Sequence, residues 1–295
     1  MRLRCVAAAA AALCITGADL QAQKQIRLLA TVSNPSGEPV TTIEPKDIGV
    51  IENGTPATVV KVEGFSRVSK VQILIDNGLG IPRQSIADLR AGLTGLLEAL
   101  PANIETTVVT TAPQPRFIER GTADKAKLMK TVALIAPDSG PGRFVESLDE
   151  ATQRVEKEPN SFHTIVSVGT TAGDLNVRDA DIERIVKRTK GGRFRLFAVL
   201  VSVGVGTTLS SGETQESVGE AVAKNTGGRF EKINAPSRLV TLLPEIGTEV
   251  AKTVGPSTRQ FRITVDRPPG MTGALGRMSM AVAGLLVSDV LVEGP

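Results

Sequence analysis

The sequence predicts an α/β protein with a doubly wound, mainly parallel sheet and a small β unit at each end. An apolar run at 71–75 stops at Asp76 and is followed by Gly78 and Gly80, which is typical of a buried strand ending in a loop. From there to residue 250, strand-like and helix-like segments alternate. Because such alternation builds parallel sheets with helices on both faces, we expect one α/β domain over 70–254.

The segment 24–66 has the pattern of a small β unit. Its extended runs at 26–32, 48–52 and 57–62 are separated by turn residues. Asn53-Gly54 lies between the last two runs, and this dipeptide between extended runs is a strong hairpin signal. We therefore expect a β hairpin at 48–62.

Within 70–254, the apolar patterns place each element in turn. The expected strands are 71–75, 104–111, 116–119, 164–168, 195–201 and 229–232. The expected helices are 82–100, 122–135, 144–155, 179–189, 213–225 and 239–250. Gly227-Gly228 follows the fifth helix, where glycine relieves the left-handed conformation of a helix end.

The segment 258–295 returns to β character. It has an extended run at 260–266, a break at Pro268-Pro269-Gly270 and an apolar run at 278–292. That last run contains Gly284 and Asp289, so a strand or strand pair is favoured over a membrane helix. We expect this C-terminal β extension to pack with the N-terminal β unit.

Residues 1–22 have the pattern of a signal peptide. Arg2 and Arg4 precede a short apolar stretch at 5–15, which is too short to span a bilayer. We therefore expect export to the periplasm or secretion, with no stable membrane span after cleavage. Cys5 and Cys14 would leave with the signal, so the mature chain would have no thiol.

The composition argues against nucleic-acid binding and catalysis. Among 295 residues, 34 basic and 31 acidic side chains nearly balance, and there is no Trp or Tyr for base stacking. The basic residues between Arg184 and Arg195 are interpreted as a solvated helix face. His163 is the only histidine, no G-x-S-x-G motif occurs, and Arg83 replaces the third glycine of a dinucleotide loop. We expect neither enzymatic activity nor a cofactor.

Several motifs together resemble a known family. They are Val71–Ile81, the segment 36–54, the helix end at Asn225–Phe230 and the tail at 261–270. Because these motifs occur together in this order and spacing, the chain resembles a von Willebrand factor A domain. It resembles more closely the exported bacterial family described as VWFA-related, known largely from Acidobacteria. The resemblance implies a Rossmann-like fold and a role in protein binding or adhesion.

The wider family often holds Mg²⁺ at a metal-ion-dependent adhesion site, with D-x-S-x-S after the first strand, a later Thr and a second Asp. Here the first Asp matches Asp76, but Gly78 and Gly80 stand at the serine positions. The Thr position falls near Gly142 and the second Asp at Thr170. Glycine supplies no side-chain oxygen, so we expect the metal to be lost and Asp76 to be held by backbone N–H groups.

The sequence therefore favours an exported, non-enzymatic protein-binding module of von Willebrand factor A type with a degenerate metal site. One alternative is a structural envelope scaffold without a switchable site. Another is a Mg²⁺-dependent adhesion domain that uses substitute carboxylates from Asp138, Glu146 or Asp174. The expected partner is a protein in the envelope or outside the cell. The expected partner-binding residues are Asp76, Asn77, Gly78, Gly80, Gly142, Arg143, Thr170, Thr171 and Asp174.

Overall fold

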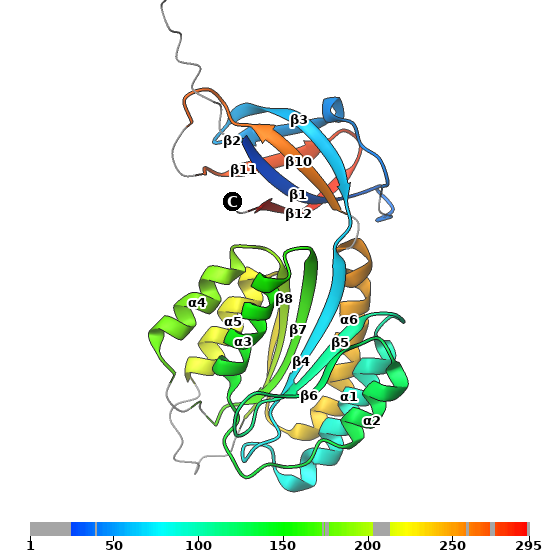
Figure 1. The fold of residues 1–295 in the computed structure, drawn as a ribbon, viewed down its shortest axis with the longest axis vertical. Coiled ribbons are helices and arrows are strands. Elements are labelled where there is room, and N and C mark those ends of the chain that lie inside the picture. Colours follow the sequence, from blue (N-terminus) through cyan, green and yellow to red (C-terminus); the bar gives the residue numbers. More distant parts are fainter. Residues whose placement is uncertain are drawn as a thin grey trace, which may run out of the picture.

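A computed structural model describes residues 25–293 apart from 39, 173, 175, 176, 203–212, 258, 259 and 272–274. The described chain forms an α/β domain and a β domain, one above the other in Figure 1. The expected signal peptide at 1–22 lies outside the described residues, as does the glycine-rich segment at 203–208.

The α/β domain contains a six-stranded sheet in the order β6-β5-β4-β7-β8-β9. The strands are β4 Val68–Ile75, β5 Glu105–Thr110, β6 Arg116–Thr122, β7 Ser161–Thr170, β8 Phe194–Val201 and β9 Arg229–Ile233. All neighbouring pairs are parallel except β5 and β6, which pair antiparallel at one edge. The predicted doubly wound, mainly parallel sheet is confirmed.

Helices cover both faces of this sheet (Figure 1). On one face lie α1 Ile86–Ala99, α2 Lys125–Ala133 and α6 Leu239–Ser257, and on the other α3 Phe144–Lys157, α4 Asp179–Thr189 and α5 Glu213–Asn225. Ile73 and Ile75 of β4 pack in the first core, whereas Leu74 packs in the second. This follows from the two-residue period of a strand, whose successive side chains point to opposite faces.

Strand β7 is longer than the predicted 164–168. All ten of its residues are buried, because it lies between β4 and β8 at the centre of the sheet. The polar residues Ser161 and His163, which precede the predicted start, are buried with the apolar ones. Sheet pairing thus overrides the local polarity of this segment.

The β domain is a second six-stranded sheet, in the order β11-β2-β3-β10-β1-β12, with hydrogen-bonded neighbours antiparallel. Its strands are β1 Gln25–Ser33, β2 Ile48–Glu52, β3 Thr55–Phe65, β10 Gln260–Asp266, β11 Met278–Val282 and β12 Leu286–Glu293. Asn53 and Gly54 join β2 to β3 with φ values of 48° and 84°, as expected for a tight hairpin turn. The predicted hairpin is present.

The N-terminal and C-terminal β segments build this one sheet together. Strand β1 lies between β10 and β12, so strands from both ends of the described chain are interleaved. Although β11 and β12 stand at opposite ends of the strand order, they are consecutive in the chain and Val282 bridges to Leu285 between them. The sheet therefore curls around a core that includes Leu28 and Ile263, and the α/β domain is inserted between β3 and β10.

Two of the motifs behind the family resemblance meet inside the β domain. Arg267 donates from Nη2 to Glu52 Oε1 at 2.6 Å and from Nε to Oε2 at 2.9 Å. Glu52 also accepts the Gly276 N–H at 3.0 Å, and both members of the pair are buried. This ion pair fixes the segment after β10 against the hairpin. Among the described helices, none has the length and apolar character needed to cross a membrane.

Candidate functional site

The structure brings the predicted metal-site positions together at the carboxyl ends of the parallel strands. Asp76 follows β4, Thr170 ends β7, and Gly142 lies in the loop before α3. The Thr170 hydroxyl donates to Asp76 Oδ2 at 3.0 Å, and the Gly78 N–H donates to Asp76 Oδ1 at 2.7 Å. Each Asp76 oxygen thus has a donor from within the domain.

The three glycines of this site are packed tightly. A Cβ atom built on Gly142 would overlap the Asp76 carboxylate, and one on Gly80 would overlap the Thr170 side chain. A Cβ on Gly78 would overlap the carbonyl oxygen of Gly140. The space that side chains take at these positions in the family pattern is therefore filled here by Asp76, Thr170 and backbone.

Asp76 is a buried carboxylate with an unusual titration. Its relative exposure is 4%, and this burial raises the pKa of Asp76 above its ordinary value. The hydrogen bonds from Gly78 and Thr170 oppose the rise, and the nearby charge of Asp174 adds to it. The pKa is raised because these two donors offset only part of the cost of burying the charge.

Two further buried oxygen atoms lie on neighbouring segments. Asn77 donates from Nδ2 to the Ala136 carbonyl at 2.8 Å, but its Oδ1 has no partner among the described residues. Thr111, directly after β5, has a buried hydroxyl that also lacks one there. The sequence reasoning named Asn77 but not Thr111, although the end of the predicted strand 104–111 pointed to it.

The predicted partner-binding residues are mostly buried. Among the nine, only Arg143 and Thr171 are half-exposed, and the others are buried. The exposed residue in the Asp76–Gly80 segment is Leu79, with a relative exposure of 61%. Sequence reasoning missed Leu79, although an apolar residue between two loop glycines was a visible signal. The buried residues shape the loops that present it.

Asp174 caps helix α3. Its oxygens accept the N–H groups of Phe144 at 2.7 Å and Val145 at 2.5 Å, and Gln215 Nε2 donates at 3.0 Å. A carboxylate at a helix N-terminus satisfies free N–H groups and interacts favourably with the helix dipole. This contact fixes the start of α3 to the segment that follows β7.

The three candidate substitute acids do not converge. Asp138 Oδ1 accepts the Gly140 N–H at 2.8 Å, and Asp174 caps α3. The Glu146 carboxylate lies 4.0 Å from Arg143 Nε on the surface. Across the described residues, no group of three or more His, Cys, Asp or Glu side chains is placed to hold a metal.

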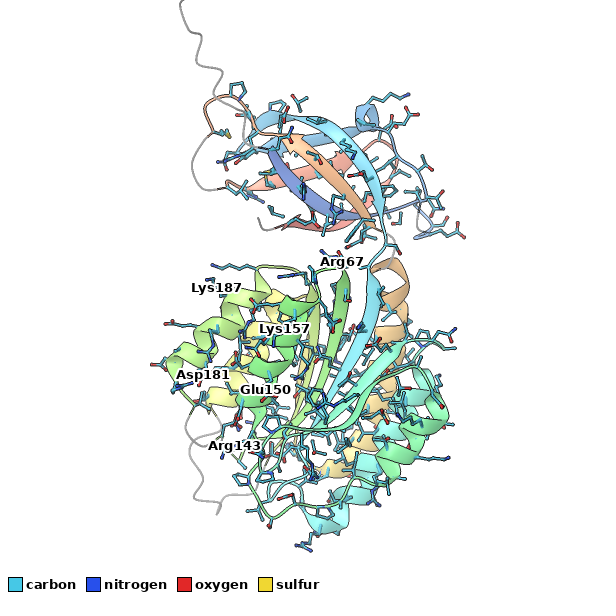
Figure 2. The ribbon with its side chains drawn as sticks, in the orientation of Figure 1. Arg67, Arg143, Glu150, Lys157, Asp181 and Lys187 are labelled. Atoms are coloured by element: carbon cyan, nitrogen blue, oxygen red, sulfur yellow. The ribbon has the colours of Figure 1, made fainter. Side chains whose placement is uncertain are left out.

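Beside this site lies a cavity of about 620 Å³ between the start of α3, the start of α4 and the segment after β5. Five carboxylates line it: Glu146, Asp149, Glu150, Asp174 and Asp181. Three guanidinium groups line it as well: Arg143, Arg178 and Arg184. Figure 2 shows Arg143, Glu150 and Asp181 on the α3 and α4 side of the sheet.

Part of the predicted basic helix face is ion-paired rather than solvated. Arg184 bridges Asp149 and Asp181 at 3.1 and 2.6 Å. The Arg188 side chain is 10% exposed and contacts Asp149 at 2.5 Å and Glu156 at 2.7 Å. The expectation of a solvated face is wrong for Arg188, because the acidic side chains of α3 cover it.

His163 lies at the opposite end of the sheet, near the start of β7. It is buried, Gln72 Nε2 donates to its Nδ1 at 3.0 Å, and its Nε2 lies 3.4 Å from Glu158 Oε2. Burial lowers the pKa of His163 to about 4, although Glu158 opposes the change. Its contacts are those of a structural residue.

The fold is similar to that of solved von Willebrand factor A proteins. A von Willebrand factor type A protein from Catenulispora acidiphila matches with a TM-score of 0.52 and 14% identity, over 81% of this chain and 73% of that one. Proximal thread matrix protein 1 from the mussel byssus, with a zinc-occupied MIDAS motif, matches with a TM-score of 0.50 and 10% identity, over 68% and 49%.

The D319A mutant of the PilB minor pilin from Streptococcus sanguinis also matches, with a TM-score of 0.50 and 10% identity over 64% of this chain and 62% of that one. No protein-family model and no curated protein sequence matches the chain. The structural likenesses define the class of protein: its α/β domain has a von Willebrand factor A-like fold.

Proposed function

We propose that this chain is an exported, non-enzymatic protein-binding module that contacts its partner through the loops at the carboxyl end of the α/β sheet, without a metal ion. One observation carries the proposal. Asp76 is satisfied from within the domain, while Leu79, three residues later, is 61% exposed. An exposed leucine on tightly packed loops is a suitable anchor for a protein contact.

The donor set at Asp76 does not fit Mg²⁺. This ion requires close to octahedral coordination by oxygen, and three of the five family positions are glycines. The side-chain oxygens of the remaining two, Asp76 and Thr170, bind each other. Asn77 Oδ1 and Thr111 Oγ1 are neutral oxygens and would leave Asp76 as the single charged ligand. Capture of a partner's carboxylate through an ion is therefore not proposed.

Export and family membership belong to this proposal. The pattern of residues 1–22 supports export, and the motifs at 36–54, 225–230 and 261–270 support membership in the VWFA-related exported family. The partner would then be a protein in the envelope or outside the cell. The lone His163, buried at the far end of the sheet, supports a non-enzymatic role.

Crosslinking of the exported protein in its native envelope, with mass spectrometry of the products, tests the proposal. We expect crosslinks from the loops around Leu79 to one protein partner, and their loss in Leu79→Asp. Val60→Asp is the matched control, because Val60 is an exposed apolar residue of the β domain with 47% exposure. Equal crosslinking by all three proteins would favour the structural scaffold instead.

A further inference from the structure

A buried arginine lies at the junction of the two domains without a counter-ion. Arg67 belongs to the short link between β3, which ends at Phe65, and β4, which begins at Val68. Figure 2 shows it between the domains, and its relative exposure is 2%. It forms no ion pair with the described residues. Because an unpaired charge is costly to remove from water, buried arginines are normally paired, and the environment of Arg67 is unusual.

The contacts of Arg67 within the described chain are few. Its Nη1 donates to the Gly192 carbonyl at 3.3 Å, and its guanidinium carbon lies 5.4 Å from the centre of the Phe65 ring. Its buried Nε has no hydrogen-bond partner among the described residues. Since a guanidinium has five N–H donors, one long hydrogen bond leaves most of its capacity available to another acceptor.

A second guanidinium without an ion pair lies beside the first. Arg193 belongs to the turn that supplies the carbonyl bound by Arg67, and its Nε lies 3.5 Å from the position of a Cβ atom built on Gly191. It is half-exposed and pairs with no carboxylate of the described chain. Burial lowers the pKa of Arg67 to about 10, and the charge of Arg193 adds to this effect, whereas Glu293 opposes it. Two neighbouring cations therefore face the junction.

The carboxylates around the junction are bound to other cations. Each contacts a different lysine or arginine at 2.7 to 2.9 Å; they are Glu63, Glu105, Glu156, Glu158 and Glu293. Eight cations stand against these five carboxylates: Lys61, Arg67, Lys70, Lys187, Arg188, Lys190, Arg193 and Arg262. Lys187 and Lys190, exposed at the end of α4, form no ion pair among the described residues either. The excess of positive charge favours the approach of an anion.

We propose that the junction binds the phosphate group of a small molecule between Arg67 and Arg193. Such a group carries close to two negative charges at neutral pH, and these match the two guanidiniums that have no carboxylate. A planar guanidinium can donate two parallel N–H bonds to it. Because Arg67 is enclosed and Arg193 is half-exposed, the ligand enters beside Arg193 and must be small. This site lies at the opposite end of the sheet from Leu79 and is independent of the proposed function.

Calorimetric titration of the full chain with inorganic phosphate, at about pH 8 so that it is a dianion, tests the proposal. Acetate at equal ionic strength is the control for a monoanion. We expect phosphate to bind and to raise the melting temperature of the wild type. Arg67→Met and Arg193→Met should each bind it about tenfold more weakly, as expected for loss of a charge-assisted contact.

Glycerol 3-phosphate is a second probe and distinguishes the source of the phosphate group. An equal affinity for both probes would assign free phosphate to the site, and a higher affinity for glycerol 3-phosphate would assign a phosphate ester. Arg83→Met is the matched control variant, because Arg83 is exposed at the other end of the sheet and forms no ion pair among the described residues. It should bind phosphate as the wild type does.

Absence of phosphate binding by the wild type, or an equal response to acetate, would overturn the proposal. So would an unchanged affinity in either folded variant, or a loss in Arg83→Met as large as in the other two. Arg193→Met keeps the test decisive if Arg67→Met does not fold, because replacement of a half-exposed side chain usually has little effect on stability. Thermal unfolding of each variant verifies that the fold is intact.

Discussion

The two ends of the parallel sheet use charge in different ways. At the amino end, beside the β domain, a buried arginine contacts backbone and an aromatic ring, and a half-buried lysine forms two ion pairs. Arg67, which Figure 2 shows between the domains, is 2% exposed, donates to the Gly192 carbonyl at 3.3 Å and lies over the Phe65 ring. Lys70 contacts both Glu105 and Glu158 at 2.8 and 2.9 Å. This end is organised for stability.

At the carboxyl end, the central carboxylate is enclosed but the surroundings remain open. Asp76 is satisfied by Gly78 and Thr170, while Leu79, Glu146 and Glu150 face solvent or a cavity. At this end the charge of Asp76 is buried, and other side chains of the same loops are accessible. The proposed function assigns the partner contact to these accessible side chains.

The largest expected effect is on the pH dependence of stability, and it tests the burial of His163 at the amino end of the sheet. Because burial lowers the pKa of His163 to about 4 from 6.5, the unfolded chain binds this proton first as the pH falls. The free energy of unfolding should therefore fall between pH 6.5 and 4, by as much as about 3 kcal/mol. Urea denaturation of wild type and His163→Gln would measure it. A pH dependence of equal steepness in both would contradict the assignment.

A smaller effect tests how tightly the loops pack around Asp76 at the carboxyl end of the sheet. Gly78→Ser restores a family serine, but its Cβ would overlap the Gly140 carbonyl, so we expect about 2 kcal/mol of destabilisation. Denaturant unfolding measures the loss, and calorimetry should detect no Mg²⁺ binding. Gly49→Ser is the matched control, since a Cβ at Gly49 meets nothing within 4 Å. A stable Gly78→Ser variant that binds Mg²⁺ would show that the site can reopen.

Asp76→Asn should stabilise the domain by about 1 kcal/mol at pH 7, because a neutral amide costs less to bury than a carboxylate. The pKa of Asp76 is raised, so the wild type regains stability as the pH falls and this carboxylate takes up a proton. The gain should therefore shrink in acid. Asp138→Asn, on a half-buried aspartate, should give no such gain. Destabilisation by Asp76→Asn at pH 7 would indicate that the carboxylate needs its charge.

The smallest effect on stability is expected at Leu79. Because this side chain is 61% exposed, Leu79→Asp should change the free energy of unfolding by less than about 0.5 kcal/mol while it abolishes the crosslinks to the partner. Thermal melts and crosslinking on the same samples measure both quantities. A large loss of stability would place Leu79 in the fold rather than on the binding face.

The sequence predicted local elements better than their assembly. Helices α4 and α5 and strand β10 begin and end at the predicted residues, because the apolar period and the breakers agree there. The antiparallel direction of β6 follows from its five-residue connection to β5, which is too short for a parallel crossover. The curled β sheet depends on long-range pairing between segments from both ends of the described chain, which no local pattern encodes.

In the candidate site, too, the positions of residues could be predicted from the sequence, whereas their burial could not. The positions of Asp76, Gly142 and Thr170 followed from the family pattern, and the structure brings them together. Their burial, and the prominence of Leu79 and Glu150, arise from how the loops pack on one another. Side-chain exposure in a loop depends on such packing and is not encoded by residue type.

The interleaving of β1 between β10 and β12 also constrains the order of folding during synthesis. The strands of the inserted α/β domain are contiguous in the chain, so this domain can form as soon as residues 68–257 have emerged. Strand β10 is synthesised after the α/β domain, so β1 and β3 lack this pairing partner until the last strands have been made. Strands with unpaired edges are prone to aggregate. We expect the nascent chain to need protection at β1–β3 for most of its translation.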